Sequence, residues 1–432
     1  MEKMVIEGGN PLRGNIRISG AKNAALPIMA SCLLLKGTSR IQGIPELTDV
    51  KTLCEILINL GVKTERCKDH TLEITVQDDS NVTAPYELVR TMRASICVLG
   101  PLLGRRGAAK VSIPGGCSIG PRPIDLHIKG IKALGAEVEM KDGYVIATGK
   151  RLKGTTVYLG GVAGSSVLGT CNILMAAVLG EGRTIITNAA CEPEVQDLAN
   201  FLNKTGAKIT GIGEKTMIID GVDELHGTEY TIIPDRIEAG TLMIAGAVTG
   251  GRVVLQNIIP GHLTSVIDKL VEIGIDIQTR TISKGNSPGK NVYECIVESN
   301  GHFNPVNITA LPYPGVPTDM QAQFTALLSI AKGVSSITEK VFPHRFVHVA
   351  ELNRMGANIR NDDAVSIING VPSLSGTTVM ASDLRASASL VIAGLVAKGV
   401  TEIRRLYHID RGYEKIEERL TSLGAKMWRE RE

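Results

Sequence analysis

The sequence predicts an α/β protein of two domains, each built from three βαβαββ-like repeats. A three-residue signature recurs six times, at intervals of 68 to 82 residues: an apolar residue or threonine, then glycine, then an apolar residue. A second glycine lies 23 to 28 residues upstream of each signature and closes an apolar run. A unit of about 70 residues is longer than usual solenoid repeats and too small to bury both its faces alone, so the units must pack on one another. The signature glycines are Gly61, Gly135, Gly206, Gly274, Gly356 and Gly424, and the upstream glycines are Gly37, Gly107, Gly182, Gly251, Gly333 and Gly399.

Within each repeat the first element should be a buried helix. The apolar run at residues 388–397 is long enough for one, and the glycine after such a run suits the left-handed position that follows a helix. A strand should come next, as at residues 252–255. A second helix with one apolar face should follow, because Ile416, Leu420 and Leu423 recur at i, i+4 and i+7. Another strand is expected after its closing glycine.

The chain of 432 residues suits two domains of about 200 residues each. The seam should fall at residues 230–234, where the segment Thr-Ile-Ile-Pro interrupts the repeat. The strand expected at residues 4–7 precedes the first repeat, so we expect it to pair within the other domain. Two such domains usually leave a cleft between them.

Composition excludes several classes of function. The net charge is +3, and 14 aromatic residues are too few for nucleic-acid stacking platforms, so we expect no nucleic-acid partner. The eight cysteines contain no C-x-x-C pair, which favours reduced thiols over a disulfide framework or a zinc site. No signal-peptide core and no apolar stretch of about 20 residues is present. We therefore expect a cytoplasmic protein that neither crosses a membrane nor binds a metal.

One cysteine occupies an unusual place. Cys117 lies in the loop Pro114–Pro123, which holds three glycines, and Arg122 follows five residues later. Glycines let backbone N–H groups approach an anion, and a neighbouring guanidinium favours the thiolate. A free cysteine is more often a buried structural thiol. We favour that role for the other seven cysteines and a reactive role for Cys117.

Six basic residues occupy repeated places in the unit. Three lie at the start of a helix, where a cation is locally unfavourable unless an anion is bound. The other three lie in the loop between the strand and the second helix. Any single arginine is more often a solvated or salt-bridged side chain, but the repeated position favours a shared anion site in the cleft. The first group is Lys22, Arg93 and Arg385, and the second is Arg122, Arg345 and Arg411.

A carboxylate lies at the start of the fifth repeat. Asp319 occurs in Pro-Thr-Asp-Met-Gln after the turn-rich segment 311–316. An acid at this place is ordinarily a helix cap or a partner for the helix dipole. The alternative is a general base that faces the cleft.

These residues closely resemble the UDP-N-acetylglucosamine 1-carboxyvinyltransferase family over nearly the whole chain. The resemblance implies the enolpyruvyl transferase fold, two inside-out α/β barrels of three repeats each, in agreement with the repeat count. It places the first domain at residues 22–233 and the second at residues 1–21 and 234–432. The matching segments are residues 19–24, 114–117, 122–127, 234–238, 317–323, 383–389 and 408–414.

The resemblance implies transfer of the enolpyruvyl group of phosphoenolpyruvate to the 3′-hydroxyl of UDP-N-acetylglucosamine, the committed step of peptidoglycan precursor synthesis. The hydroxyl adds to C2, C3 is protonated, and phosphate leaves from a tetrahedral ketal. Asp319 matches the carboxylate that takes the hydroxyl proton, and Cys117 matches the cysteine associated with C3 protonation. Lys22, Arg122 and Arg411 match cations on the phosphate side.

The resemblance also implies that no cofactor or metal is used and that the epoxide fosfomycin alkylates Cys117. Arg93, Arg345 and Arg385 match further members of the anion cluster. The complete set of substrate-binding residues implied is Lys22, Asn23, Arg93, Arg122, Pro123, Ile124, Asp125, Leu126, Ser166, Val167, Asp319, Val341, Arg345, Arg385 and Arg411.

Three alternatives stay open at this point. The sister enzyme 5-enolpyruvylshikimate 3-phosphate synthase shares the fold and the chemistry but lacks an equivalent of Cys117. A paralogue that binds nucleotide sugar without turnover is disfavoured by Lys22, Cys117, Asp319 and Arg411. RNA-processing enzymes built on related repeats would need a large basic surface, which the near-neutral composition does not suggest.

Overall fold

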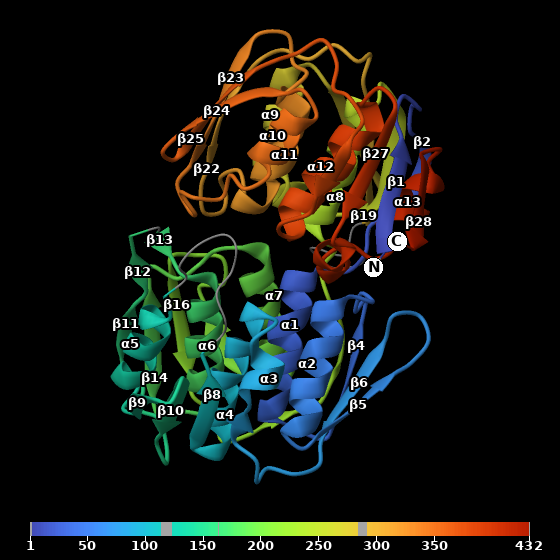
Figure 1. The fold of residues 1–432 in the computed structure, drawn as a ribbon. Coiled ribbons are helices and arrows are strands. Elements are labelled where there is room, and N and C mark those ends of the chain that lie inside the picture. Colours follow the sequence, from blue (N-terminus) through green and yellow to red (C-terminus); the bar gives the residue numbers. More distant parts are fainter. Residues whose placement is uncertain (1, 114–122, 163, 284–291, 432) are drawn as a thin grey trace. The chain divides into compact units, whose positions relative to one another are not determined.

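The computed structural model describes residues 2–113, 123–162, 164–283 and 292–431, and the chain divides into two compact units (Figure 1). Unit 1 comprises the described residues up to Ser19 and from Pro234 onward, and unit 2 those from Gly20 to Ile233. Cys117 and Arg122 lie outside the described residues. Each unit has its own apolar core. In each, buried helices lie inside and sheets lie outside.

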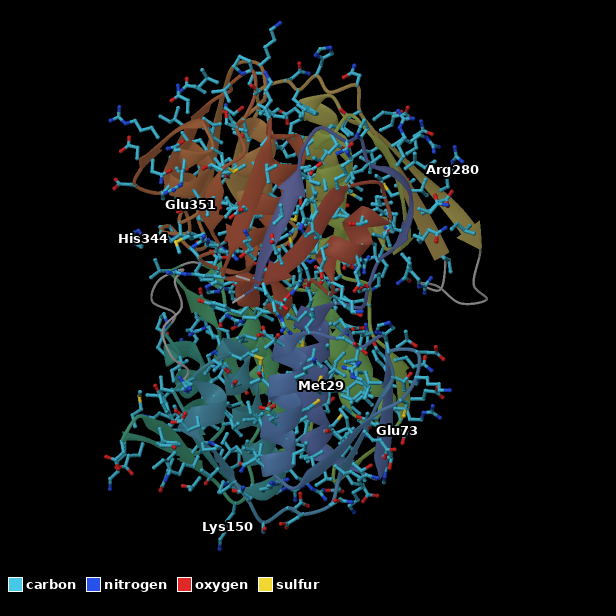
Figure 2. The ribbon with its side chains drawn as sticks, turned by 45° about the vertical axis from the view of Figure 1, so that its right-hand side comes forward. Met29, Glu73, Lys150, Arg280, His344 and Glu351 are labelled. Carbon is cyan, nitrogen blue, oxygen red and sulfur yellow. The ribbon has the colours of Figure 1, made fainter. Side chains whose placement is uncertain are left out.

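Unit 2 is organised around the buried helices α1, α4 and α6, with η2 leading into α4. Met29 of α1 lies in this interior, whereas Lys150 projects into solvent (Figure 2). The elements are α1 (Lys22–Ser31), η1 (Cys32–Leu34), β3 (Leu35–Lys36), β4 (Thr38–Gln42), α2 (Thr48–Asn59), β5 (Val62–Arg66), β6 (Leu72–Val76), β7 (Thr83–Ala84), α3 (Tyr86–Val89), η2 (Arg93–Val98), α4 (Leu99–Arg106), β8 (Ala108–Ser112), α5 (Asp125–Ala133), β9 (Glu137–Lys141), β10 (Tyr144–Thr148), β11 (Thr156–Tyr158), β12 (Gly160–Gly161), β13 (Gly164–Ser165), α6 (Val167–Ala177), β14 (Arg183–Thr187), α7 (Pro193–Lys204), β15 (Lys208–Thr210), β16 (Thr216–Asp220), β17 (Leu225–His226) and β18 (Glu229–Thr231).

Unit 1 repeats this plan with α8, α10 and α12 as its buried helices. These three helices contact one another, and each also packs directly against a strand of the surrounding sheets. The elements are β1 (Glu2–Glu7), β2 (Arg13–Arg17), α8 (Arg236–Val248), β19 (Arg252–Ile258), η3 (Pro260–His262), α9 (Thr264–Ile273), β20 (Asp276–Ser283), β21 (Val292–Glu298), β22 (Asn307–Ala310), η4 (Thr318–Met320), α10 (Gln321–Leu328), β23 (Val334–Glu339), α11 (Val349–Arg354), β24 (Asn358–Asp362), β25 (Val365–Asn369), β26 (Thr378–Met380), α12 (Leu384–Val396), β27 (Val400–Arg404), η5 (Leu406–Arg411), α13 (Ile416–Thr421) and β28 (Lys426–Arg431).

The predicted repeat is confirmed by the sheets. The described chain contains six four-stranded sheets of one design, exemplified by the order β7-β8-β10-β9. In this sheet β7 and β8 are parallel, and the chain between them forms a buried helix. β9 and β10 form an antiparallel hairpin, and β10 also pairs antiparallel with β8. Each repeat is therefore a βαβαββ unit with its long helix on the inside of the barrel.

Strands distant in sequence complete three of the repeats. β1 pairs antiparallel with both β27 and β28, as predicted for the N-terminal strand, with Met4 opposite Ile403 and Arg429. β2 pairs parallel with β19, so the N-terminal segment supplies two strands to unit 1. β18 pairs parallel with β4 and completes the first repeat of unit 2.

The repeated glycines hold left-handed backbone positions. Eleven of the twelve have positive φ, as expected after a helix. The prediction for Gly251 is wrong by one residue, because Gly250 takes the left-handed conformation with φ +63°. Gly251 serves another need: a Cβ there would lie 2.0 Å from the carbonyl oxygen of Leu12. Close approach of two backbones therefore requires this glycine.

Within the described ranges no helix is both long enough and apolar enough to cross a membrane. In the same ranges no group of three or more His, Cys, Asp or Glu side chains is arranged to hold a metal ion.

Candidate active site

The structure brings Asp319 together with two of the predicted cations. Asp319 lies in the short helix η4 at the entrance to α10. Its Oδ1 accepts a hydrogen bond from Arg345 Nη1 at 2.7 Å, and its Oδ2 accepts one from Arg385 Nη2 at 3.3 Å. Pro317, not Asp319, occupies the cap position of η4. The carboxylate thus lies between two guanidinium groups, which we call the Asp319 cluster.

Arg385 is the most deeply buried member of this cluster, with 2% of its surface exposed. It lies in the first turn of α12, where the Asp383 side chain caps the helix by accepting from the backbone N–H groups of Arg385 and Ala386. Two of its donors, Nε and Nη1, find no acceptor among the described residues. Because an incompletely paired buried cation is costly, an anionic ligand at this position would be favoured.

A polar network beneath Arg385 fixes its orientation. The guanidinium lies over the ring of Tyr413, 5.4 Å from its centroid. The Tyr413 hydroxyl lies 2.9 Å from Thr241 Oγ1, and Gln323 Nε2 donates to both of these oxygens. Sequence reasoning missed Tyr413 and Gln323 as supporting residues, because each lies on a helix face or loop whose partner is distant in sequence.

The buried carboxylate of Glu339 positions the loop that contains Val341 and Arg345. Glu339, at the end of β23, accepts from the backbone N–H groups of Val341 and Phe342 and from the Thr318 hydroxyl. Burial raises the pKa of Glu339. Arg345 also donates to Thr318 at 3.1 Å. This carboxylate therefore sets the loop that aims Arg345 at Asp319. His344, its exposed neighbour, projects away from the unit (Figure 2).

Arg411 lies at the end of η5, half-buried, in the loop after β27. The segment that follows it packs against the start of α12: a Cβ on Gly412 would lie 2.4 Å from a methyl group of Leu384. Leu384 immediately precedes Arg385. The loop of Arg411 and the helix of Arg385 are therefore built against each other.

In unit 2, Lys22 has a carboxylate partner that the sequence did not reveal. Lys22 is the first residue of α1, and its Nζ lies 3.0 Å from Asp49 Oδ2 in the first turn of α2. Both side chains are nearly buried. An acid in the first turn of a helix is usually a dipole partner, so position alone gave no reason to single out Asp49. Asn23, half-buried, follows in the same helix.

The predicted nucleotide-side residues gather at two helix N-termini. Pro123 and Ile124 lead into α5, which begins with Asp125 and Leu126. Arg93, the first residue of η2, donates to the Pro123 carbonyl oxygen at 3.4 Å. Backbone N–H groups at a helix start favour anionic or acceptor groups of a ligand.

The second N-terminus is that of α6. Ser166 caps this helix by accepting from the Gly169 N–H at 3.1 Å, and Val167 is its first helical residue. Since α5 and α6 pack together along the Asn172–His127 contact, the two helix starts belong to one surface of unit 2.

His127 and Asn172 lock these helices. Asn172 accepts from the Gly100 N–H through Oδ1 and donates through Nδ2 to the Ile96 carbonyl and to His127 Nδ1 at 2.8 Å. This arrangement leaves the proton of the neutral imidazole on Nε2. Burial, reinforced by the charge of Arg93, lowers the pKa of His127 to about 4. Sequence reasoning did not identify this pair.

Cys117 and Arg122 lie outside the described residues, so their geometry stays a prediction. The seven described cysteines are free, and five are buried, as predicted for structural thiols. Burial raises the pKa of Cys32, Cys97 and Cys295 to about 12. These thiols are therefore protonated and unreactive at neutral pH.

Comparison with known proteins bears on these observations. Residues 6–420 match the model of the EPSP synthase (3-phosphoshikimate 1-carboxyvinyltransferase) family. The chain is 55% identical over 433 residues to UDP-N-acetylglucosamine 1-carboxyvinyltransferase 2 of Carboxydothermus hydrogenoformans, covering 99% of each chain. It is 49% identical to UDP-N-acetylglucosamine 1-carboxyvinyltransferase of Myxococcus xanthus, covering 100% of each.

Solved structures agree in fold. The enolpyruvyl transferase NikO of Streptomyces tendae superposes with a TM-score of 0.85 at 26% identity, covering 99% of this chain and 98% of that one. An EPSP synthase of Acinetobacter baumannii, at 20% identity and a TM-score of 0.76 over the whole of both chains, shares the fold. The predicted enolpyruvyl transferase fold is thus confirmed, and the chain belongs to the EPSP synthase family, as one of its UDP-N-acetylglucosamine 1-carboxyvinyltransferases.

Proposed function

We propose that this protein transfers the enolpyruvyl group of phosphoenolpyruvate to the 3′-hydroxyl of UDP-N-acetylglucosamine and releases inorganic phosphate. The hydroxyl oxygen bonds to C2 while C3 gains a proton. Loss of a C3 proton and of phosphate from the ketal then restores the double bond. The observation that carries the proposal is the Asp319 cluster, in which one carboxylate lies beside two guanidiniums, one with unused donors. Such a site supplies a proton acceptor and anion donors together.

Asp319 takes the proton of the sugar hydroxyl in this proposal. Arg345 and Arg385 hold the carboxylate in place and offer donors to the anionic groups of phosphoenolpyruvate. Burial favours this use of Arg385, because charged hydrogen bonds are stronger away from water.

Lys22, Arg122 and Arg411 are assigned to the phosphate in the same proposal. Lys22 supports this role by its burial at a helix start, where an anion and the Asp49 carboxylate are alternative partners. The starts of α5 and α6, with Arg93, are assigned to the nucleotide sugar. Cys117 is proposed as the acid for C3 from its sequence setting alone.

The decisive experiment is a steady-state assay of phosphate release from phosphoenolpyruvate. UDP-N-acetylglucosamine and shikimate 3-phosphate are offered in turn as acceptors. We expect release only with the nucleotide sugar. Release with shikimate 3-phosphate would instead identify the sister activity, and binding of nucleotide sugar without release would identify a non-catalytic relative.

The proposal includes alkylation of Cys117 by fosfomycin and a cytoplasmic location, which suits the seven free thiols. Mass mapping after limited treatment should find Cys117 labelled first, because burial keeps Cys32, Cys97 and Cys295 protonated. UDP-N-acetylglucosamine should speed the labelling. Equal labelling of the half-buried Cys54 would remove Cys117 from the active site. Cys117→Asp should resist the drug and keep turnover, since a carboxylic acid can also protonate C3.

A further inference from the structure

Beside the loop that carries Arg411, three acids share the guanidinium of Arg429: Asp410, Glu417 and, at 3.6 Å from Nη1, Glu2. Arg429, in the C-terminal strand β28, donates to Asp410 through Nη2 at 2.6 Å and through Nη1 at 3.0 Å. The same guanidinium donates to Glu417 at 3.0 Å, and its Nε lies 2.7 Å from the other Glu417 oxygen. Asp410 directly precedes Arg411, and Glu417 lies in the first turn of α13.

This contact spans a strained part of the backbone. Arg405 and Lys415, on either side of η5 and the turn into α13, adopt φ of +61° and +43°, which non-glycine residues avoid. Such conformations persist only where surrounding contacts over-determine them. On one side the segment packs on Leu384 and places Tyr413 beneath Arg385. On the other side Arg429 supplies the restraint.

The contact with Arg429 also fixes the orientation of the Asp410 carboxylate, which directly precedes Arg411 in the chain. A bidentate pair between arginine and carboxylate occupies both oxygens of Asp410. Without Arg429, the Asp410 carboxylate would be free to turn to Arg411, its immediate neighbour, and to compete with an anionic substrate. Glu417 would add a second uncompensated negative charge nearby.

We propose that Arg429 is a positioning residue for the phosphate of phosphoenolpyruvate. It engages Asp410 and Glu417 and so keeps the charge of Arg411 directed to the substrate. This inference rests on the proposed function for the identity of the anion. The evidence for the role of Arg429 is its hydrogen bonding from β28 to Asp410 in η5. Arg429 itself need not touch the substrate.

The test compares Arg429→Gln, Arg429→Lys and the double variant Asp410→Asn/Arg429→Gln in the phosphate-release assay. Arg429→Gln should raise the KM for phosphoenolpyruvate about tenfold, with less than a twofold change for UDP-N-acetylglucosamine. The double variant should recover most of this loss, because the competing carboxylate is gone. Arg429→Lys keeps the charge but not the fork, so it should fall between.

A matched control is Arg183→Gln. Arg183 also makes a bidentate pair, donating to Asp220 through Nε at 2.7 Å and through Nη2 at 3.0 Å, between exposed positions on strands of unit 2. The Arg183→Gln variant should leave the KM values for phosphoenolpyruvate and UDP-N-acetylglucosamine unchanged. The inference is overturned if Arg429→Gln behaves like Arg183→Gln, or if Asp410→Asn does not rescue it, because the arginine then serves only the fold. Should Arg429→Gln not fold, a wild-type KM in Arg429→Lys would overturn it equally.

Failure of this inference is distinct from failure of the proposed function. An unaltered protein that releases no phosphate contradicts the proposed function. Calorimetry with phosphoenolpyruvate as the probe, in the presence of UDP-N-acetylglucosamine, then still tests the role of Arg429. Weaker binding by Arg429→Gln and recovery in the double variant would support it, and equal binding by all variants would reject it.

Discussion

The two units treat their buried charges differently. In unit 1 one carboxylate, Asp319, is shared by the two guanidiniums of Arg345 and Arg385, so the cluster carries one excess positive charge. In unit 2 the ammonium of Lys22 is paired with the carboxylate of Asp49. A guanidinium cluster with surplus donors can bind an anion directly. An ammonium that is already paired with a carboxylate must exchange that partner for the anion. The difference suggests that unit 1 holds anion sites ready and that unit 2 adjusts.

Removal of Asp319 should have the largest effect. Asp319→Ala leaves two guanidiniums without their shared carboxylate and removes the proposed base, so kcat should fall about 10³-fold. Binding of UDP-N-acetylglucosamine, measured by calorimetry, should change little, because a base acts mainly in the transition state. Asp220→Ala, which breaks the Arg183 pair, is the control and should keep full activity. Near-normal turnover of Asp319→Ala would reduce Asp319 to a structural acid.

Removal of Asp49 tests whether the unit 2 pair exchanges partners. Asp49→Asn leaves Lys22 buried without its carboxylate, which should cost about 3 kcal/mol of stability. Phosphoenolpyruvate with UDP-N-acetylglucosamine should return part of that loss, seen as a larger ligand-induced rise in Tm than in the unaltered protein. Asp223→Asn, in an exposed pair with Arg151, should show neither effect. A ligand-induced rise no larger than wild type would mean that Lys22 does not take the anion.

Acid should lower the free energy of unfolding of both units through their buried histidines, and this effect should be smaller than the two effects above. The pKa of His127 is lowered from 6.5 to about 4, mainly by burial. Below pH 6.5 the unfolded chain therefore binds a proton that the folded chain refuses, and stability falls with falling pH down to about pH 4. His127 should account for about 2 kcal/mol between pH 7 and pH 5.

Urea unfolding of His127→Gln at these two pH values measures this contribution. The variant should lose less stability on acidification than the unaltered protein. His348 of unit 1, whose pKa burial also lowers to about 4, should account for a similar share. Unchanged pH dependence in His127→Gln would show that the imidazole is charged in the folded protein.

The repeat and its helices were predictable because they depend on local periodicity and on glycines that end helices. The N-terminal strand could be placed in the other domain because it precedes the first repeat. Arg345 and Arg385 were predictable as candidate anion-binding cations because each occupies a repeated position in the unit. Asp319 was singled out by its segment at the start of the fifth repeat and by the family resemblance. Asp49, Tyr413 and Glu339 were not, because each acts through a contact with a residue from another element. Their sequence neighbourhoods are ordinary helix starts and strand ends, so only the packed structure distinguishes them.

The N-terminal strand has a consequence for how the chain assembles. Residues 20–233 are contiguous, so unit 2 has all its strands as soon as that stretch has emerged from the ribosome. The last sheet of unit 1 cannot form until β28 is made, because β1 lies between β27 and β28. β1 can therefore pair with β27 only when most of the chain has been made, and closing a loop of almost the whole chain makes this pairing a slow, late step. Until then, unit 1 exposes an open sheet edge that a chaperone or a second nascent chain can occupy.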